Sequence, residues 1–253
     1  MSRIMSRLVA MAWLLVAVDA NLEERVATLE AEIGSLSNEL QVLRALVLGQ
    51  PESEEDRAEC REGRNITSTG AYCTVLLESQ KFNEELAEGI CKIVDPTDTI
   101  VDLGARIGMY TRYFRERSCV RLALAYDGGI GVREMSSGLV QHLDLTQLHN
   151  IGVFDWVLSL EVAEHIPPEY ESVYIENLHR HNRKGIIMSW AFPGQSGVGH
   201  VNEQHAPQVR LMFKELGYLF DPRATRRLRS TCHSHLSYFM NTLLVFRRNT
   251  TFH

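Results

Sequence analysis

The stretch from Thr99 to Phe114, TIVDLGARIGMYTRYF, decides the fold of this chain. Its first part, up to Leu103, is an apolar run that predicts a buried strand, and Met109 to Arg117 has the apolar spacing of a helix. Gly104 and Gly108 predict a tight turn between the two. A glycine turn that leads into a helix N-terminus presents backbone N–H groups, which attract anions and carboxylates. The stretch therefore predicts a ligand-binding turn.

The sequence on both sides of this turn alternates between strand and helix patterns. Further strands are predicted over 120–126, 140–143, 154–160, 185–191 and 238–246, and helices over 82–93, 169–181 and 208–216. Strands that alternate with helices predict a doubly wound α/β sheet. In such a sheet, ligands bind at the carboxyl ends of the strands.

Acidic side chains stand at the predicted carboxyl ends of the strands. Asp102 ends the first strand, Asp127 the second and Asp144 the third. An acid in the position of Asp127 can hold two ribose hydroxyls, and Asp144 is placed to accept a hydrogen bond from an adenine amino group. The fourth strand runs into SLEVAEHIP, where Glu161 and the Glu164–His165 pair come to the rim of the same crevice.

These motifs carry a family resemblance. The region from Lys81 to Arg248 resembles the class I S-adenosylmethionine-dependent methyltransferases, in the turn GARIG after Asp102 and in the block FDWVLSLEVAEHIP. The segments GIIMSWAFPGQSGVGHVNEQ and LMFKELGY resemble the fifth strand with its substrate-side loop and the helix before the last hairpin. No substrate subfamily is identified.

The resemblance implies a fold, a cofactor and an activity. It implies a Rossmann-like, seven-stranded sheet with an antiparallel last strand, and a transferase that moves a methyl group from S-adenosyl-L-methionine to a small molecule or a protein side chain. The donor site that it implies consists of Asp102, Gly104, Ala105, Gly108, Asp127, Asp144, Leu145 and Glu161.

Arg106 is the departure from the family pattern, because it stands where the turn normally has a glycine. A non-glycine residue in a left-handed conformation costs roughly 1–2 kcal/mol. Two interpretations are open. The guanidinium folds outward or pairs with the donor's carboxylate, and the protein is an enzyme; or it fills the site or pairs with Asp102 or Glu161, and the domain is a catalytically inactive binding or scaffold protein.

Three residues are candidates for a general base that takes a proton from a hydroxyl acceptor: His165, Glu164 and His200. Each has a structural alternative. Glu164 and His165 can serve only to cap the helix that begins near Pro167, and His200 can have a structural role in its glycine-rich loop. No metal is expected from the six histidines at 179, 181, 200, 205, 233 and 235. Those at 179/181 and 233/235 are two residues apart, and no cysteine or acid framework joins them.

The composition of the chain limits its partners. The 253 residues, 45% of them apolar, suffice for one large domain and a smaller appendage. A net charge of -6 argues against a nucleic-acid partner, since phosphate neutralisation needs a basic face. The arginines at 223, 226, 227 and 229 are interpreted as a solvated charged face or loop.

Residues 1–20 have the pattern of a secretory signal peptide. Arg3 and Arg7 precede an apolar run from Leu8 to Val18, and a possible cleavage site follows Ala20. The run is shorter than the about 20 residues of a membrane span. We therefore expect a secreted or lumenal protein, with an uncleaved membrane anchor as one alternative. A mitochondrial presequence is another, because the first 18 residues carry arginine and serine but no acid.

A heptad repeat follows, from Leu22 to Val47. Leucine occupies the d positions 22, 29, 36 and 43, and mostly β-branched residues occupy the a positions 26, 33, 40 and 47. This pattern favours a parallel two-stranded coiled coil, and Arg25 with Glu30 and Glu39 with Arg44 form matched g–e pairs in such a homodimer. The alternative is a single amphipathic helix that lies on its own globular domain.

The segment 50–72 is acidic and polar and lacks apolar periodicity. The predicted organisation is thus a signal peptide or anchor (1–20), a coiled coil (21–49), a linker (50–72) and a methyltransferase-like domain (73–253). Cys60 and Cys73 are candidates for a disulfide if the chain is exported. Cys91 and Cys119 are expected to be buried core residues.

Overall fold

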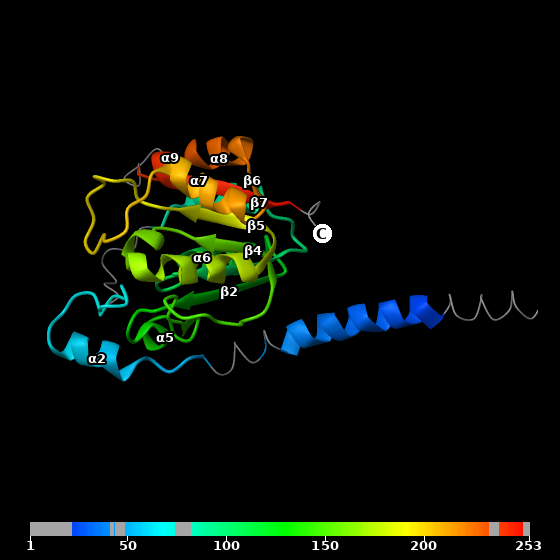
Figure 1. Ribbon diagram of the computed structural model, residues 1–253, viewed down its shortest axis with the longest axis horizontal. Coiled ribbons are helices and arrows are strands. Elements are labelled where there is room, and N and C mark those ends of the chain that lie inside the picture. Colours follow the sequence, from blue (N-terminus) through cyan, green and yellow to red (C-terminus); the bar gives the residue numbers. More distant parts are fainter. Residues whose placement is uncertain (1–21, 41–42, 44–48, 74–81, 233–237, 250–253) are drawn as a thin grey trace, which may run out of the picture. The chain divides into compact units, whose positions relative to one another are not determined.

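The computed structural model describes residues 22–40, 43, 49–73, 82–232 and 238–249 (Figure 1). The chain divides into two compact units, Met1–Arg44 and Ala45–His253. In the first unit, residues 22–40 form a helix whose described a and d side chains are all exposed, from 46% at Val26 to 65% at Leu36. The predicted signal peptide lies outside the described residues. Within the described part of the chain, no helix has the length and apolar character that crossing a membrane requires.

The second unit is built on a seven-stranded sheet with the strand order β3-β2-β1-β4-β5-β7-β6. Strands β1 to β5 pair in parallel, and β7 runs antiparallel to both β5 and β6. The predicted fold class, a doubly wound sheet with an antiparallel last strand, is therefore confirmed. The strands are β1 Thr99–Leu103, β2 Leu122–Asp127, β3 Val140–His142, β4 Phe154–Ser159, β5 Asn182–Ser189, β6 Tyr218–Phe220 and β7 Leu243–Arg248.

Helices cover the sheet because its central strands are apolar on both faces. Every residue of β1 and β4 is buried. On one face, Leu86 of α3, Phe114 of α4 and Leu228 of α8 join one core cluster with side chains of the strands. Figure 1 shows α6 lying across the strands toward the viewer. The helices in this unit are α2 Glu54–Arg61, α3 Glu84–Cys91, α4 Met109–Arg117, α5 Val132–Met135, α6 Glu171–Arg180, α7 Ala206–Glu215, α8 Pro222–Arg229 and α9 Phe239–Thr242.

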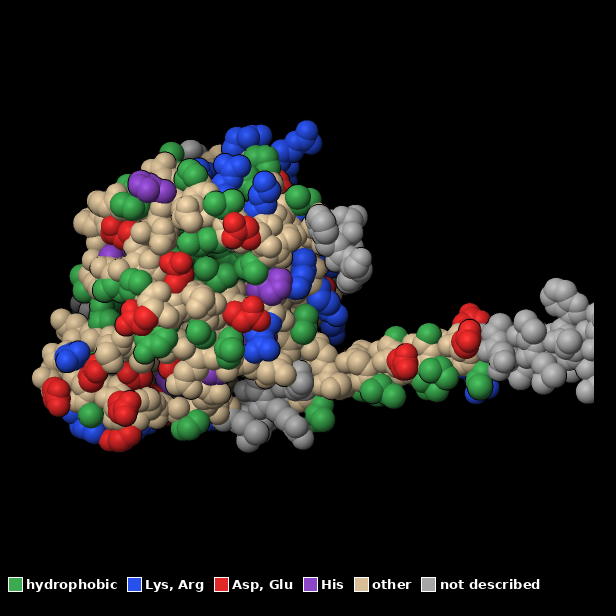
Figure 2. Space-filling model, in the orientation of Figure 1, with side chains coloured by type: hydrophobic (Ala, Val, Ile, Leu, Met, Phe, Trp, Pro, Cys, Tyr) green, Lys and Arg blue, Asp and Glu red, His purple; other side chains and the backbone are tan. Residues whose placement is uncertain are grey.

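The C-terminal region differs from its prediction. The strand expected over 238–246 begins only at Leu243, because α9 occupies the first half of that segment. The arginine-rich stretch forms α8, which Asp221 caps by accepting hydrogen bonds from the backbone N–H groups of residues 223 and 224. Three of its four arginines are exposed, and Figure 2 shows basic side chains gathered over this end of the molecule. This agrees with a solvated charged face.

The segment 50–72 was expected to be a linker, but the structure places it in the same compact unit as the sheet. Ser53 caps α2 by accepting a hydrogen bond from Asp56 N. The N–H of Gln50 donates to the carbonyl of His142, the last residue of β3, and a disulfide joins Cys60 to Cys73. A backbone hydrogen bond to β3 and a disulfide therefore fix the segment 50–72, although its low apolar content predicted that it would not pack on the domain.

A second disulfide joins Cys91, at the end of α3, to Cys119, just after α4. The sequence predicted two buried core residues here. They do pack against the core cluster and are partly buried, but they are bonded to each other. Periodicity cannot predict this pairing, because it depends on how α3 and α4 meet. Cys232 is a free, buried thiol.

Candidate functional site

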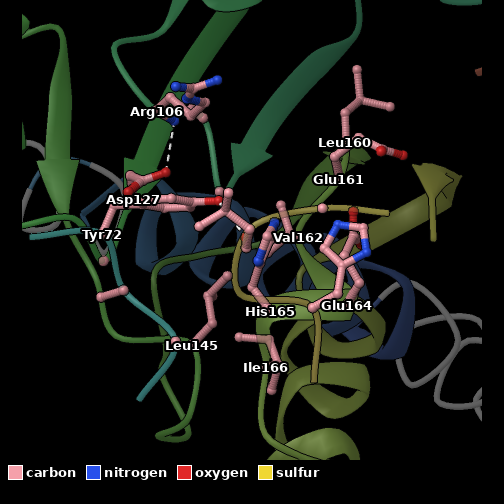
Figure 3. Close-up of a pocket in the computed structure, with 18 of the residues that line it drawn as sticks. Tyr72, Arg106, Asp127, Leu145, Leu160, Glu161, Val162, Glu164, His165 and Ile166 are labelled. Carbon is pink, nitrogen blue, oxygen red and sulfur yellow. Dashed lines mark hydrogen bonds between the residues drawn. The ribbon is translucent and has the colours of Figure 1, made fainter. Parts of the chain in front are cut away.

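A cavity of about 410 Å³ opens at the carboxyl ends of β1, β2 and β4, within the range of small-molecule sites. Six segments of the second unit contribute most of its wall. They supply residues 69–72, 104–107, 127–128, 144–145, 160–162 with 164–166, and 195–198 with 200. Figure 3 shows Arg106 and Asp127 together at one side and Glu164 and His165 together at the other. The site thus lies where a doubly wound sheet binds ligands.

The glycine turn is tied to the end of β2. The N–H groups of Gly104 and Ala105 donate to the carbonyl of Tyr126, and the N–H of Arg106 donates to Asp127 Oδ2 at 2.7 Å. A Cβ atom at residue 104 would lie 2.2 Å from the Val162 side chain, so only glycine fits there. The close approach of residue 162 explains the first glycine of the motif.

Arg106 has a φ of 53°. This is the left-handed conformation whose cost the sequence analysis considered for a non-glycine residue in the turn. Figure 3 shows its guanidinium pointing away from Asp127. The two acids proposed as its alternative partners accept hydrogen bonds from other groups: Asp102 from Thr111, and Glu161 from Gln195 and Thr242. Arg106 is part of the cavity wall, and the cavity is open with the side chain in place.

The three predicted strand-end acids all line the cavity. Asp102 is 4% exposed, and burial raises its pKa to about 8. Burial also raises the pKa of Asp127, which accepts hydrogen bonds from the N–H groups of Arg106 and Gly129. Asp144 accepts from the residues that follow it, Thr146 and Gln147. Because a carboxylate oxygen can accept two hydrogen bonds, Asp127 keeps acceptor capacity for a ligand.

Of the other predicted donor-site residues, four line the cavity and one packs behind it. Gly104, Ala105, Leu145 and Glu161 line the cavity, but Gly108 is not among the lining residues. A Cβ atom at residue 108 would lie 2.9 Å from the side chains of Leu139 and Val140. Gly108 therefore serves the packing of the turn against β3, and its predicted role in donor contact is not seen.

Glu161 and Glu164 form a pair of buried carboxyl groups. Glu161 has a φ of 55° and accepts hydrogen bonds from Gln195 and Thr242. Glu164 is 0% exposed, and neither of its carboxylate oxygens has a hydrogen-bond partner of normal geometry among the described residues. Burial, and then the charge of Glu161, raise the pKa of Glu164 well above its usual value; nearby backbone groups of Glu164 and Ala191 oppose this rise.

The structure brings the three predicted base candidates together. Ligand atoms of Glu164, His165 and His200 lie within 4.8 Å of one another, and the two imidazole rings meet edge to face at 5.2 Å. The capping alternative is not seen, because no side chain caps the turn η3 (Pro168–Tyr170) or α6. Glu164 and His165 instead end the preceding turn η2 (Ala163–His165) and line the cavity.

Sequence reasoning missed one wall of the site. Residues 69–72, assigned to the linker, line the cavity, and the hydroxyl of Tyr72 donates to the carbonyl of Val198 at 3.1 Å. The Tyr72 ring also meets His165 edge to face at 5.4 Å. The only sequence signal for this wall was the candidate disulfide between Cys60 and Cys73, next to Tyr72.

Comparisons with known proteins identify the fold. No family model matches the chain, and no curated protein matches its sequence. Among solved structures, the magnesium protoporphyrin IX methyltransferase ChlM from Synechocystis PCC 6803, with bound S-adenosylhomocysteine (SAH), is 16% identical with a TM-score of 0.50, covering 87% of this chain and 100% of that one. CalS10, an amino pentose methyltransferase from Micromonospora echinaspora with bound S-adenosylmethionine (SAM), is 12% identical with a TM-score of 0.51, covering 68% of this chain and 93% of that one. The chain therefore has the class I SAM-dependent methyltransferase fold, with no subfamily specified.

Proposed function

We propose that this protein is a SAM-dependent methyltransferase. The observation that carries the proposal is the cavity itself, which opens at the ligand-binding end of a methyltransferase fold and is lined by seven of the eight predicted donor-site residues. We assign the methionyl end of the donor to the turn at Gly104–Ile107, its ribose to Asp127 and its adenine to Asp144 and Leu145. The solved neighbours that hold SAM or SAH support SAM as the donor.

The residues of this chain have two tasks in the reaction. The first is alignment, since holding the acceptor against the donor supplies much of the rate. The second is to take a proton from a hydroxyl acceptor, for which Glu164, His165 and His200 line the cavity. When bound, SAM supplies an electrophilic methyl group: an acceptor lone pair forms the new bond to carbon, the carbon–sulfur bond breaks, and its electron pair stays on sulfur. The acceptor class that we propose is a small molecule or a protein side chain.

Arg106 supports a second candidate, an inactive methyltransferase-like scaffold. A bulky cation in the donor turn is the feature that favours it, and the left-handed φ of 53° adds backbone strain. The enzyme is favoured because the cavity is open with Arg106 in its wall and because Asp102 and Glu161 accept hydrogen bonds from other groups.

Thermal unfolding with a panel of nucleotides tests the proposed function. A ligand at 100 times its dissociation constant adds about 2.7 kcal/mol of stability, which for a domain of this size raises the unfolding midpoint by about 5–10 °C. We expect SAM and SAH to raise the midpoint of the full chain, and NAD and ATP at equal concentration to leave it unchanged. A midpoint that responds to none of the four would contradict donor binding.

We further propose that the chain is a homodimer through a parallel coiled coil between Leu22 and Val47. In the first unit, the described a and d side chains of this segment are exposed on their helix, and a stripe of large apolar side chains in heptad spacing is stable when a second helix covers it. Arg44 and Val47 lie outside the described residues.

We also propose that the protein belongs to the secretory pathway, secreted or lumenal, with membrane anchoring and mitochondrial import as the alternatives. Two disulfides, Cys60 to Cys73 and Cys91 to Cys119, support the proposal because disulfides persist mainly in oxidising compartments. N-terminal sequencing of protein recovered from the medium of a secreting cell line tests it. A mature chain that begins at Asn21 is expected, and retention of the whole chain inside the cells would contradict export.

A further inference from the structure

Glu164 needs a partner that the described part of the chain does not supply. Its side chain is completely buried and lines the cavity, and its oxygens have no hydrogen bond of normal geometry and no ion pair among the described residues. Burying a carboxylate is costly unless it is paired or coordinates a metal. The neighbouring acid Glu161 cannot be that partner, because it has a like charge. It also accepts hydrogen bonds from Gln195 and Thr242.

The two histidines beside Glu164 are held as metal ligands are held. His165 Nδ1 lies 3.1 Å from the carbonyl of Gly199, and His200 Nδ1 lies 3.0 Å from both the carbonyl of Gln195 and Glu203 Oε1. Because a carbonyl oxygen only accepts, Nδ1 is the protonated nitrogen in each ring, and Nε2 carries the lone pair. Metal-binding histidines characteristically donate their other N–H to a carbonyl or a carboxylate in this way.

The spacing of the three residues suits a single ion. Their ligand atoms lie within 4.8 Å of one another, whereas ligands at about 2.0–2.2 Å from one tetrahedral ion are about 3.3–3.6 Å apart. Side-chain movements of about one ångström therefore close the group around an ion. Room for the His200 ring comes from Gly197, where a Cβ atom would lie 2.0 Å from His200 Nε2.

We propose that Glu164, His165 and His200 bind one divalent transition-metal ion at the wall of the cavity. Two imidazole nitrogens and one carboxylate suit Mn²⁺, Fe²⁺, Co²⁺ or Zn²⁺ better than Ca²⁺. Three protein ligands leave coordination positions open, as in catalytic metal sites. If the proposed methyl transfer is correct, the three residues hold the ion instead of taking the proton themselves. The ion's task is then to bind an oxygen acceptor and make its hydroxyl easier to deprotonate. The acceptor is then a hydroxyl compound.

The histidine spacing did not indicate this metal site, because the proposed ligands come from two segments that are far apart in the sequence. Glu164 and His165 follow β4, and His200 lies in the loop after β5. The backbone of this loop is tied to the first segment, since the N–H groups of Val201 and Asn202 both donate to the carbonyl of Glu164. These two hydrogen bonds place His200 beside Glu164 and His165.

Metal titration of the full chain tests the proposal. Protein stripped with a chelator is titrated with Mn²⁺ and, separately, with Zn²⁺, and binding is followed by calorimetry and by the Mn²⁺ electron paramagnetic resonance signal. We expect about one ion per chain, and at least a tenfold loss of affinity in Glu164→Gln and in His200→Gln. Glu203→Gln, which removes the carboxylate behind His200, should weaken binding by about 10- to 100-fold.

His205→Gln is the matched control, because His205 is exposed at the start of α7 and lies outside the cavity wall. It should bind the ion as the natural protein does. No binding to the natural protein, or equal binding by Glu164→Gln and His200→Gln in chains whose unfolding midpoints show that they are folded, overturns the metal site. SAM binding is measured on the same samples. Ion binding without SAM binding refutes the methyltransferase but leaves the metal site standing. SAM binding without ion binding refutes the metal site but leaves the methyltransferase standing.

Discussion

Asp102 is a buried acid near the end of the central strand β1, and its protonation couples the site to the stability of the fold. Burial raises its pKa from 3.8 to about 8. The folded protein therefore holds a proton that the unfolded chain releases above about pH 4. This proton stabilises the fold fully below pH 4, and its contribution is lost as the pH rises toward 8.

Asp102→Asn should remove this pH dependence, because an amide cannot titrate. Without donor present, the free energy of unfolding of the natural protein should fall relative to the variant between about pH 4 and pH 8, by up to about 1.4 kcal/mol per pH unit. Urea denaturation of both proteins at several pH values measures the difference. Parallel curves across this range would show that Asp102 does not hold the proton.

At the scale of residues, the sequence predicted what depends on local chemistry. Asp127 and Asp144 could be placed because acids at the ends of parallel strands meet at one edge of a sheet. The packing of Gly108 against Leu139 and Val140 could not be predicted, because it is a tertiary contact. The sequence named His200 and Glu164 as candidates for the same role, but their close approach is a tertiary contact that it could not show.

At the scale of elements, the disulfide between Cys60 and Cys73 connects the region before the sheet to the donor cavity. It closes a loop with a sequence separation of 13, and such a loop contributes about 3 kcal/mol. Tyr72, next to one cysteine, contacts Val198 and His165 in the cavity wall. This element was read as a linker because nothing in its polar composition indicates that it is fixed covalently.

Removing this disulfide should weaken the donor site as well as the fold. Cys60→Ser with Cys73→Ser is expected to lower the free energy of unfolding by about 3 kcal/mol, and to reduce SAM affinity because Tyr72 loses its anchor. The matched control is Cys91→Ser with Cys119→Ser, since neither of these cysteines lines the cavity. It should lose stability but keep its SAM affinity. Equal SAM affinity in both double variants would disprove the role of the first disulfide.

At the scale of the whole molecule, the proposed homodimer depends on the helix of residues 22–40. Leu29 and Leu36 are d positions whose side chains are 54% and 65% exposed. Replacing both with lysine puts charges into the proposed seam, so sedimentation equilibrium should give the mass of a monomer instead of a dimer. Thr28→Lys with Ser35→Lys adds the same charges at c positions, outside the seam, and should remain dimeric. A dimer mass for the seam variant would refute the coiled coil.

The central claim for the whole molecule is that the cavity beside Arg106 binds SAM. Calorimetric titration of SAM into the full chain, beside the Arg106→Gly variant, tests it most directly. We predict that the natural protein binds one SAM per chain, and that the variant binds with similar affinity because the cavity is already open with the arginine in place. Heat of binding in the variant alone would contradict the account, because Arg106 would then block the donor site and the natural protein would be the inactive scaffold.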